Sequence, residues 1–323
     1  MSKFPDNIFD IVSEDLVAVE EELYSIIQSP VDMVNDIGVH LVQAGGKRIR
    51  PALYLLCARG GVPNQAELLP MAVAIELIHM ATLVHDDIID NAATRRGRPT
   101  ANARWGNHSS VLTGDYLFAK AFSAIILARK NMLKILTDVI CNICEGEIIQ
   151  LKEAFNANQT EADYRLRVAQ KTADFIAASC ELGAIAGGLD EKSVIRVREY
   201  GYALGMAFQI TDDILDITAS AEQLGKPVGN DLRQGIVTLP VIYALKNSPR
   251  SDELRNIIIN QKMSDDEVKR GLEIIHQTEA VEYSYGQVHT YLQHARNSLP
   301  ATLNSSVRES LFAVADFVGL RKY

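Results

Sequence analysis

The chain has 323 residues and a formal net charge of −9, from 41 acidic and 32 basic residues. Its hydrophobic share of 47% and charged share of 23% are typical of globular proteins, and they exclude a disordered or collagen-like chain. We expect no nucleic-acid partner, because phosphate contacts need a basic face that an acidic chain does not provide. The excess of nine carboxylates therefore needs another explanation.

Neither a leader nor a membrane span is predicted. Residues 1–22 carry scattered acids and lack a basic segment followed by an apolar core, so we expect no signal peptide. The longest apolar stretch, residues 68–84, is interrupted by Pro70, Glu76 and His79, so we expect no transmembrane segment.

Two of the four cysteines, Cys141 and Cys144, form a Cys-x-x-Cys pair. No second pair follows at the spacing of a zinc site. The pair lies in the apolar run 135–151, so we predict reduced thiols that are packed in the core. Reduced thiols and the lack of a leader together predict a cytoplasmic protein.

Helices are predicted along most of the chain, because apolar residues recur at three- and four-residue spacing. The predicted helices start near residue 16 and continue over 31–42, 51–58, 67–89, 109–128, 135–155, 163–183 and 191–217, with surface helices over 246–284. Glycine and proline breakers separate these runs, and no run alternates as a strand should. We predict an all-α fold and one domain over residues 1–323.

Two aspartate clusters share the pattern Asp-Asp-x-x-Asp, at residues 86–90 and 212–216. The first and last acids of each cluster lie one helical turn apart on the same face. Like charges at that separation repel by roughly 2–3 kcal/mol at an effective dielectric constant near 20, so cations are needed to offset them. Oxygen ligands without clustered cysteine or histidine suit Mg²⁺, which shares its remaining positions with phosphate oxygens. A solvated acidic helix end is the alternative, but apolar residues surround both clusters.

Basic segments near the clusters predict an anionic ligand. Residues 45–51 form a glycine turn that enters a helix, with Pro51 suited to the first helical position. Further cations stand at 95–97, just after the first cluster, at 171–172, and at 225–227, just after the second. Each segment alone is typical of a solvated surface. Together with the aspartates they indicate a site for one or two diphosphates, since neither a phosphate loop nor a nucleophile elbow is present.

The chain resembles the trans-isoprenyl diphosphate synthases, or polyprenyl synthetases. The resemblance rests on Gly-Gly-Lys-Arg-Ile-Arg-Pro at 45–51, Asp-Asp-x-x-Asp at 86–90, Arg-Arg-Gly at 95–97, Lys-Thr at 171–172, Phe-Gln-Ile-Thr-Asp-Asp-Ile-Leu-Asp at 208–216 and Gly-Lys-Pro at 225–227. These motifs cover most of residues 40–245. The resemblance implies an isoprenoid-synthase-type helical bundle around a deep central cavity, usually dimeric, with Mg²⁺ ions that usually number three.

The resemblance also implies a role for each motif residue. The metal ligands would be Asp86, Asp90 and Asp212, supported by Asp87, Asp213 and Asp216. The allylic diphosphate would be held by Arg95, Lys171 and Lys226, with Thr172 and Gln209 near the reacting carbon and Lys171, Thr172 and Gln209 as catalytic residues. Isopentenyl diphosphate would be bound by the Gly46 backbone and by Lys47, Arg50, Arg96 and His79. Without the resemblance, His79 is better interpreted as a core histidine.

The implied reaction is ionisation, condensation and elimination, and two small residues bear on the product. Thr82 and Ala81 stand four and five positions before Asp86, about one helical turn deeper. Family members that make short products commonly carry an aromatic residue there. We therefore predict an all-trans polyprenyl diphosphate synthase with a medium- or long-chain product, about C30–C50, for a quinone side chain.

Several alternatives stay open. The enzyme could make a shorter product, geranylgeranyl or farnesyl diphosphate. It could act as a homodimer, or as the catalytic subunit of a heteromeric synthase. A terpene cyclase is disfavoured by the second aspartate-rich cluster, and a non-catalytic partner subunit is disfavoured because both clusters are intact.

Overall fold

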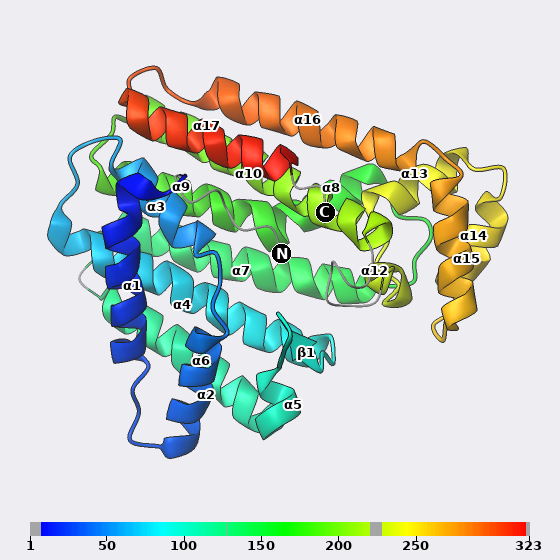
Figure 1. Ribbon diagram of the computed structural model, residues 1–323, viewed down its shortest axis with the longest axis horizontal. Coiled ribbons are helices and arrows are strands. Elements are labelled where there is room, and N and C mark those ends of the chain that lie inside the picture. Colours follow the sequence, from blue (N-terminus) through cyan, green and yellow to red (C-terminus); the bar gives the residue numbers. More distant parts are fainter. Residues whose placement is uncertain (1–7, 127, 220–227, 321–323) are drawn as a thin grey trace.

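The computed structural model describes residues 8–126, 128–219 and 228–320, and within these ranges it is helical apart from a short hairpin (Figure 1). The helices are α1 (Ser13–Ile26), α2 (Asp32–Gln43), α3 (Ile49–Ala58), α4 (Gln65–Ile89), α5 (Ala101–Trp105), α6 (Asn107–Ala124), α7 (Lys130–Glu153), α8 (Glu161–Val168), α9 (Asp174–Ala186), α10 (Glu191–Thr218), α12 (Asn230–Arg233), α13 (Leu239–Asn247), α14 (Ser251–Ile259), α15 (Asp265–His276), α16 (Ala280–Ser298) and α17 (Ser305–Leu320). A 3₁₀ turn, η1 (Asp10–Val12), precedes α1, and a π-helical turn, η2 (Ala169–Ala173), joins α8 to α9. The predicted all-α fold is confirmed.

The long helices run along the long axis of the molecule (Figure 1). Helix α10 packs against both α9 and α16, α3 packs against α9, and α4 packs against α6. Helices α1 and α2 cross one end of this bundle steeply, while α14 and α15 stand at the other end (Figure 1). The ends of α4 and α10, which carry the two aspartate clusters, are thereby held in one scaffold.

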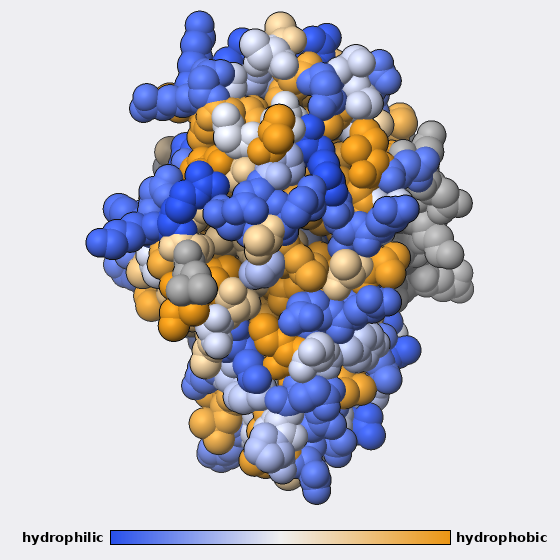
Figure 2. Space-filling view, turned by 90° about the vertical axis from the view of Figure 1, so that its left-hand side faces the viewer, coloured by the Kyte–Doolittle hydropathy of each residue, from blue (hydrophilic) through white to orange (hydrophobic). Residues whose placement is uncertain are grey.

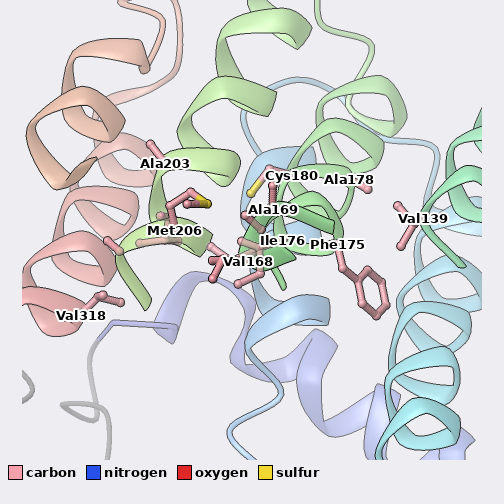
Figure 3. Close-up of a cluster of buried hydrophobic side chains, with 14 of the residues drawn as sticks. Val139, Val168, Ala169, Phe175, Ile176, Ala178, Cys180, Ala203, Met206 and Val318 are labelled. Carbon is pink, nitrogen blue, oxygen red and sulfur yellow. The ribbon is translucent and has the colours of Figure 1, made fainter. Parts of the chain in front are cut away.

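The core is made of aliphatic and aromatic side chains from helices far apart in the sequence. In Figure 3, Val139 of α7, Phe175 of α9, Met206 of α10 and Val318 of α17 belong to one buried cluster. Each such side chain contributes about 1.5–3 kcal/mol when it is removed from water. The cluster therefore ties the helices that carry the cleft residues to the C-terminal helix.

Helix α4 is long and apolar on nearly all sides, and its place in the bundle explains this composition. Among the described residues it is the one helix that could cross a membrane by length and composition, but 67% of its most apolar window is buried. A helix surrounded by protein needs no polar face. Figure 2 shows one end of the molecule, where hydrophobic residues form separate patches among hydrophilic ones.

Two local predictions are wrong. Cys141 and Cys144 are exposed rather than packed in the core, because α7 buries only one stripe, which includes Leu136, Val139 and Ile143. Pro51 is the third residue of α3, which begins at Ile49. A proline is still tolerated there, since the N–H groups of the first helical turn have no partner within the helix.

Candidate active site

The first aspartate cluster lies at the C-terminal end of α4, where its three acids have different surroundings. Asp87 is only 4% exposed, and one of its oxygens, Oδ1, accepts a hydrogen bond from Arg95 Nε at 2.7 Å. Asp86 and Asp90 are half-buried, and the backbone N–H of Asp90 donates to the Asp86 carbonyl at 2.8 Å. Burial raises the pKa of Asp86 to about 6, so a nearby cation would favour its charged form.

Arg95 is aimed at the cluster by the hairpin of β1 (Thr94–Arg95) and β2 (Arg98–Pro99). The two residues of its turn, Arg96 and Gly97, both have positive φ angles, 53° and 75°. Two consecutive positive φ angles are typical of the turn that matches the twist of a two-residue hairpin. The sequence predicted no strand here, because two residues per strand are too few to show alternation.

The second cluster lies near the end of α10, and two of its acids face inward. Asp213 Oδ2 accepts a hydrogen bond from the Tyr164 hydroxyl at 2.7 Å, and Asp213 Oδ1 accepts one from Gln209 Nε2 at 2.8 Å. Asp216 is 1% exposed, and its Oδ2 accepts a hydrogen bond from the backbone N–H of Asp231 at 3.0 Å. Asp212 is the most exposed of the three acids.

A cleft of about 250 Å³, open to solvent, brings parts of both clusters together. Its lining includes Asp90, Arg95, Lys171, Thr172, Gln209 and Asp213. Lys171 and Thr172 stand on η2, and wide turns of this kind inside helices are frequent at functional sites. The Thr172 hydroxyl donates to Gln209 Oε1 at 2.9 Å, and Lys171 Nζ lies 2.6 Å from Glu147 Oε2.

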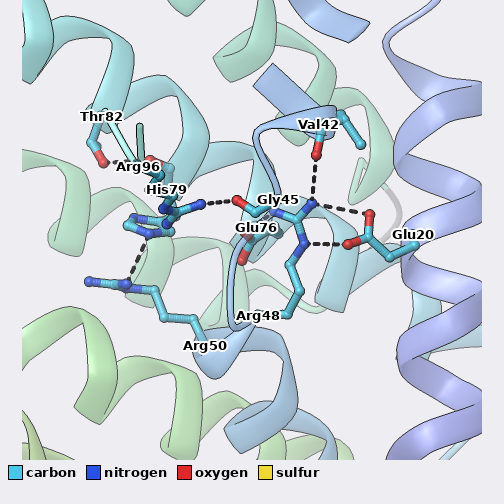
Figure 4. Close-up of polar contacts among 9 residues, drawn as sticks. All are labelled: Glu20, Val42, Gly45, Arg48, Arg50, Glu76, His79, Thr82 and Arg96. Atoms are coloured by element: carbon cyan, nitrogen blue, oxygen red, sulfur yellow. Dashed lines mark hydrogen bonds and ion pairs between the residues drawn. The ribbon is translucent and has the colours of Figure 1, made fainter. Parts of the chain in front are cut away.

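A second group of predicted residues gathers where α3 begins beside α4 (Figure 4). Arg50 Nη1 lies 3.2 Å from His79 Nε2, and the Arg96 guanidinium donates to the Gly45 carbonyl. The Arg96 guanidinium also lies close to Gly46, since a Cβ atom there would stand 2.8 Å from Arg96 Nη1. The structure therefore brings four of the five predicted isopentenyl diphosphate residues, Gly46, Arg50, His79 and Arg96, into one neighbourhood.

Lys47, the fifth residue of that set, points toward the C-terminal helix, where its Nζ lies 5.0 Å from the centre of the Phe317 ring. Arg50 lies 4.9 Å above the ring of Phe175. Both cations thus rest on aromatic faces, which attract positive charge.

Burial affects the charges of both His79 and Arg50. Burial, and then the neighbouring arginines, lower the pKa of His79 well below its ordinary value, so the imidazole is neutral near pH 7. Burial also lowers the pKa of Arg50 to about 10, which leaves this guanidinium charged at that pH. Arg50 and Arg96 place two positive charges beside neutral His79, and such a group of residues is suited to an anion.

Sequence reasoning did not single out three further residues. Arg48 turns inward, with its Nη1 2.7 Å from Glu76 Oε1 and its Nε 2.8 Å from Glu20 Oε1 (Figure 4). Tyr164 contacts Asp213, and Glu147 contacts Lys171, but neither residue belongs to a motif that the sequence alone would reveal. Only their contacts across the fold reveal them.

The remaining predicted residues are Lys226, Ala81 and Thr82. Lys226 lies outside the described residues. Ala81 is fully buried in α4, and the Thr82 hydroxyl donates to the His79 carbonyl of the same helix at 2.8 Å.

Within the described ranges, no three His, Cys, Asp or Glu side chains stand close enough to enclose a metal ion by themselves. Mg²⁺ is usually held by one or two carboxylates together with substrate phosphates and water. Asp86 and Asp90, which share one face at the end of α4, offer such carboxylates.

Comparisons with known proteins agree with this site. The polyprenyl synthetase family model matches residues 31–275. The chain is 42% identical to heptaprenyl diphosphate synthase component 2 of Bacillus subtilis, over 98% of this chain and 90% of the relative. It is 33% identical to octaprenyl diphosphate synthase of Escherichia coli, over 96% and 97% of the two chains.

Among solved structures, the polyprenyl synthase of Caulobacter crescentus complexed with calcium and isoprenyl diphosphate superposes with a TM-score of 0.93. It is 34% identical, over the full length of both chains. The predicted family and enzyme class are confirmed. The chain belongs to the polyprenyl synthetase family of prenyltransferases.

Proposed function

We propose that the chain is a Mg²⁺-dependent all-trans polyprenyl diphosphate synthase, which extends an allylic diphosphate with successive isopentenyl diphosphates. The cleft that joins parts of both aspartate clusters to Arg95 and Lys171 carries this proposal. Carboxylates and cations around one cleft suit a diphosphate bound partly through metal. A matched polyprenyl synthase that holds calcium and isoprenyl diphosphate supports the same chemistry.

Asp86, Asp90 and Asp212 would hold the Mg²⁺ ions, three in number by the family resemblance. Asp87, Asp213 and Asp216 would support these ligands from behind. When bound, Mg²⁺ would neutralise the negative charge that develops on the departing diphosphate.

The chain's own residues would bind and orient the allylic substrate. Lys171 and Arg95, with Lys226, would hold its diphosphate, while the Thr172 hydroxyl and the Gln209 carbonyl oxygen would face the reacting carbon. When the carbon–oxygen bond breaks, the electron pair leaves with the diphosphate and an allylic cation remains. Oxygen dipoles aimed at this carbon would stabilise the cation.

Isopentenyl diphosphate would bind next to the allylic site, beside the residues that gather around His79. Arg50, Lys47 and Arg96, the Gly46 backbone and neutral His79 would bind its diphosphate. Its double bond attacks the cation and forms the new carbon–carbon bond. The released diphosphate then takes a proton from the adjacent carbon, which leaves a new double bond, so the protein need not supply a base.

The product would be of medium or long chain, about C30–C50, because small residues occupy the predicted floor at Ala81 and Thr82. The heptaprenyl and octaprenyl synthases among the relatives support this range. A quinone side chain is the proposed use of such a product.

The whole chain, residues 1–323, would act as one domain in the cytoplasm, and we propose a homodimer. Large apolar side chains exposed on α6 and α7, Leu112 and Ile148 among them, support an assembly surface. The Bacillus relative is named as component 2 of its enzyme, which supports a heteromeric partner as the alternative.

The test is a reaction of the purified chain with farnesyl diphosphate, labelled isopentenyl diphosphate and Mg²⁺. We expect a ladder of products that ends beyond geranylgeranyl diphosphate and disappears when Mg²⁺ is chelated. Asp86→Asn and Asp212→Asn should abolish the ladder, whereas Asp138→Asn, at an exposed surface ion pair with Lys134, should leave it intact. A ladder that stops at geranylgeranyl diphosphate would contradict the proposed product length.

A further inference from the structure

We infer that Tyr164 and Asp213 are positioning residues that orient the Gln209 side-chain amide, so that its carbonyl oxygen faces the reacting end of the allylic substrate. The inference rests on the proposed function. It assigns a role to Tyr164, and it gives Asp213 a task other than metal binding.

A continuous chain of hydrogen bonds links these residues across three elements. The Tyr164 hydroxyl, on α8, donates to Asp213 Oδ2 at 2.7 Å, and Gln209 Nε2 donates to Asp213 Oδ1 at 2.8 Å on α10. The Thr172 hydroxyl, on η2, donates to Gln209 Oε1 at 2.9 Å. All four residues line the cleft.

The chemistry of the acid decides which way the amide points. A glutamine amide has a donor end and an acceptor end, and by itself it can turn either end toward a neighbour. The Asp213 carboxylate offers only acceptors, so the amino group of Gln209 must face it. The carbonyl oxygen of Gln209 is then left for Thr172 and the cleft, where the negative end of the amide dipole is needed beside a developing cation.

Tyr164 in turn fixes the acid. Its side chain is 1% exposed and Asp213 is 4% exposed, so neither can exchange its partner for bulk water. The phenol holds Asp213 Oδ2 and leaves Oδ1 aimed at Gln209. Loss of this one hydroxyl would free the carboxylate to rotate, and with it the amide.

The first test compares two buried tyrosines. Tyr164→Phe should lower kcat roughly tenfold while the KM for isopentenyl diphosphate stays within about twofold, because one buried hydrogen bond is lost at the reacting end only. Tyr200→Phe is the matched control. Tyr200 stands on α10, nine residues before Gln209. It is as buried as Tyr164, and its hydroxyl donates to the Leu311 carbonyl at 2.7 Å.

Tyr200→Phe should keep the wild-type kcat although its melting temperature falls about as far as that of Tyr164→Phe. An unchanged kcat in Tyr164→Phe would overturn the inference. So would an equal loss of kcat in both variants, since that would mark a general effect of destabilisation.

The second test separates positioning from metal binding at Asp213. Asp213→Asn can turn an amino group toward Gln209, so kcat should fall at least as far as in Tyr164→Phe, with an unchanged half-saturating Mg²⁺ concentration. A half-saturating concentration that rises severalfold would identify Asp213 as a ligand and overturn the inference. If the wild-type chain makes no prenyl product at all, the proposed function fails, which is a different outcome from any of these.

The third test measures coupling along the chain. The losses from Tyr164→Phe and Thr172→Val should be clearly less than multiplicative in the double variant, because both hydroxyls help to hold the same Gln209 amide, Thr172 by direct contact and Tyr164 through Asp213. Fully multiplicative losses would show that the two hydroxyls act independently and would contradict the inference.

Discussion

Lys171 is paired with an acid in the cleft, and this pairing has a kinetic consequence. Its Nζ lies 2.6 Å from Oε2 of Glu147, which is 7% exposed on α7. The close approach of α7 to η2 depends on Gly146, since a Cβ atom there would come within 3.2 Å of the Lys171 backbone nitrogen. An incoming diphosphate therefore competes with Glu147 for this cation.

Glu147→Gln should lower the KM for the allylic diphosphate severalfold, because it removes a buried negative charge but keeps the size of the side chain. Steady-state kinetics with varied allylic substrate would measure this. Glu145→Gln, an exposed neighbour on the same helix, serves as the control and should leave the KM unchanged. A higher KM in Glu147→Gln would show instead that the acid holds Lys171 in its binding position.

At the residue scale, the sequence predicted the residues that belong to spaced motifs. Asp86 and Asp90 could be assigned to one face because helical spacing alone sets it. The partners Tyr164 and Glu147 could not be predicted, because their contacts join positions 49 and 24 residues apart and exist only once α7, α8, η2 and α10 have packed.

Helix α3 begins at a buried ion pair rather than at an ordinary cap. Arg48 has a positive φ angle of 46°, is 7% exposed, and pairs with Glu76 on α4 and Glu20 on α1. It thereby fixes the turn that presents Gly46, Lys47 and Arg50. Its inward direction explains why this basic residue of the motif pairs with Glu76 and Glu20 rather than joining Arg50 beside His79.

Arg48→Ala should lower the free energy of unfolding by about 3–5 kcal/mol, because Glu76 would stay buried without its partner. Denaturant unfolding would measure the loss. Glu20→Ala should cost much less, since the Glu20 side chain is 39% exposed and can be hydrated. Equal losses in the two variants would contradict a dominant role for the Glu76 pair.

Helix α4 is also the predicted wall of the product cavity. Ala81→Phe should shorten the longest product by several isoprene units, because a ring at this fully buried position would fill space beneath the first aspartate cluster. The product ladder measures this, and the melting temperature shows whether the variant folds. A folded variant with an unchanged ladder would place the floor elsewhere.

At the element scale, periodicity located the helices up to α10, apart from the short α5, to within a few residues, whereas α16 and α17 were not predicted. The predicted helix 163–183 is in fact α8, η2 and α9 in succession, because a widened turn keeps the same apolar pattern while it turns Lys171 and Thr172 into the cleft. The exposed Cys141 and Cys144 show the opposite limit. A mixed apolar run predicts a helix, but it does not predict which residues of α7 are buried against the core.

For the whole molecule, the excess of nine carboxylates has a partial account. Six aspartates stand in the two clusters, and their proposed partners, Mg²⁺ and diphosphate, are not counted in the formal charge. Many of the other acids lie on exposed helix surfaces, as in the pairs of Glu253 with Arg250 and Arg270. The acidity is thus consistent with a polyanionic substrate that is reached through metal.

Exposed apolar side chains on α6 and α7 bear on how the whole molecule assembles. Leu112 on α6 is 67% exposed and Ile148 on α7 is 65% exposed, and Phe122 and Leu151 on the same two helices are exposed as well. Exposed apolar residues that gather in one patch mark an interaction site. We predict that light scattering will give the mass of a dimer for the purified chain. The double variant Leu112→Glu with Ile148→Glu should become monomeric and lose activity.

The control is Val62→Glu, in the loop before α4, where Val62 is 91% exposed. We expect this variant to remain dimeric. A wild-type chain that is monomeric and inactive alone would contradict the homodimer. Recovery of activity on addition of a second protein would then favour the heteromeric arrangement, in which the same apolar side chains meet a different subunit.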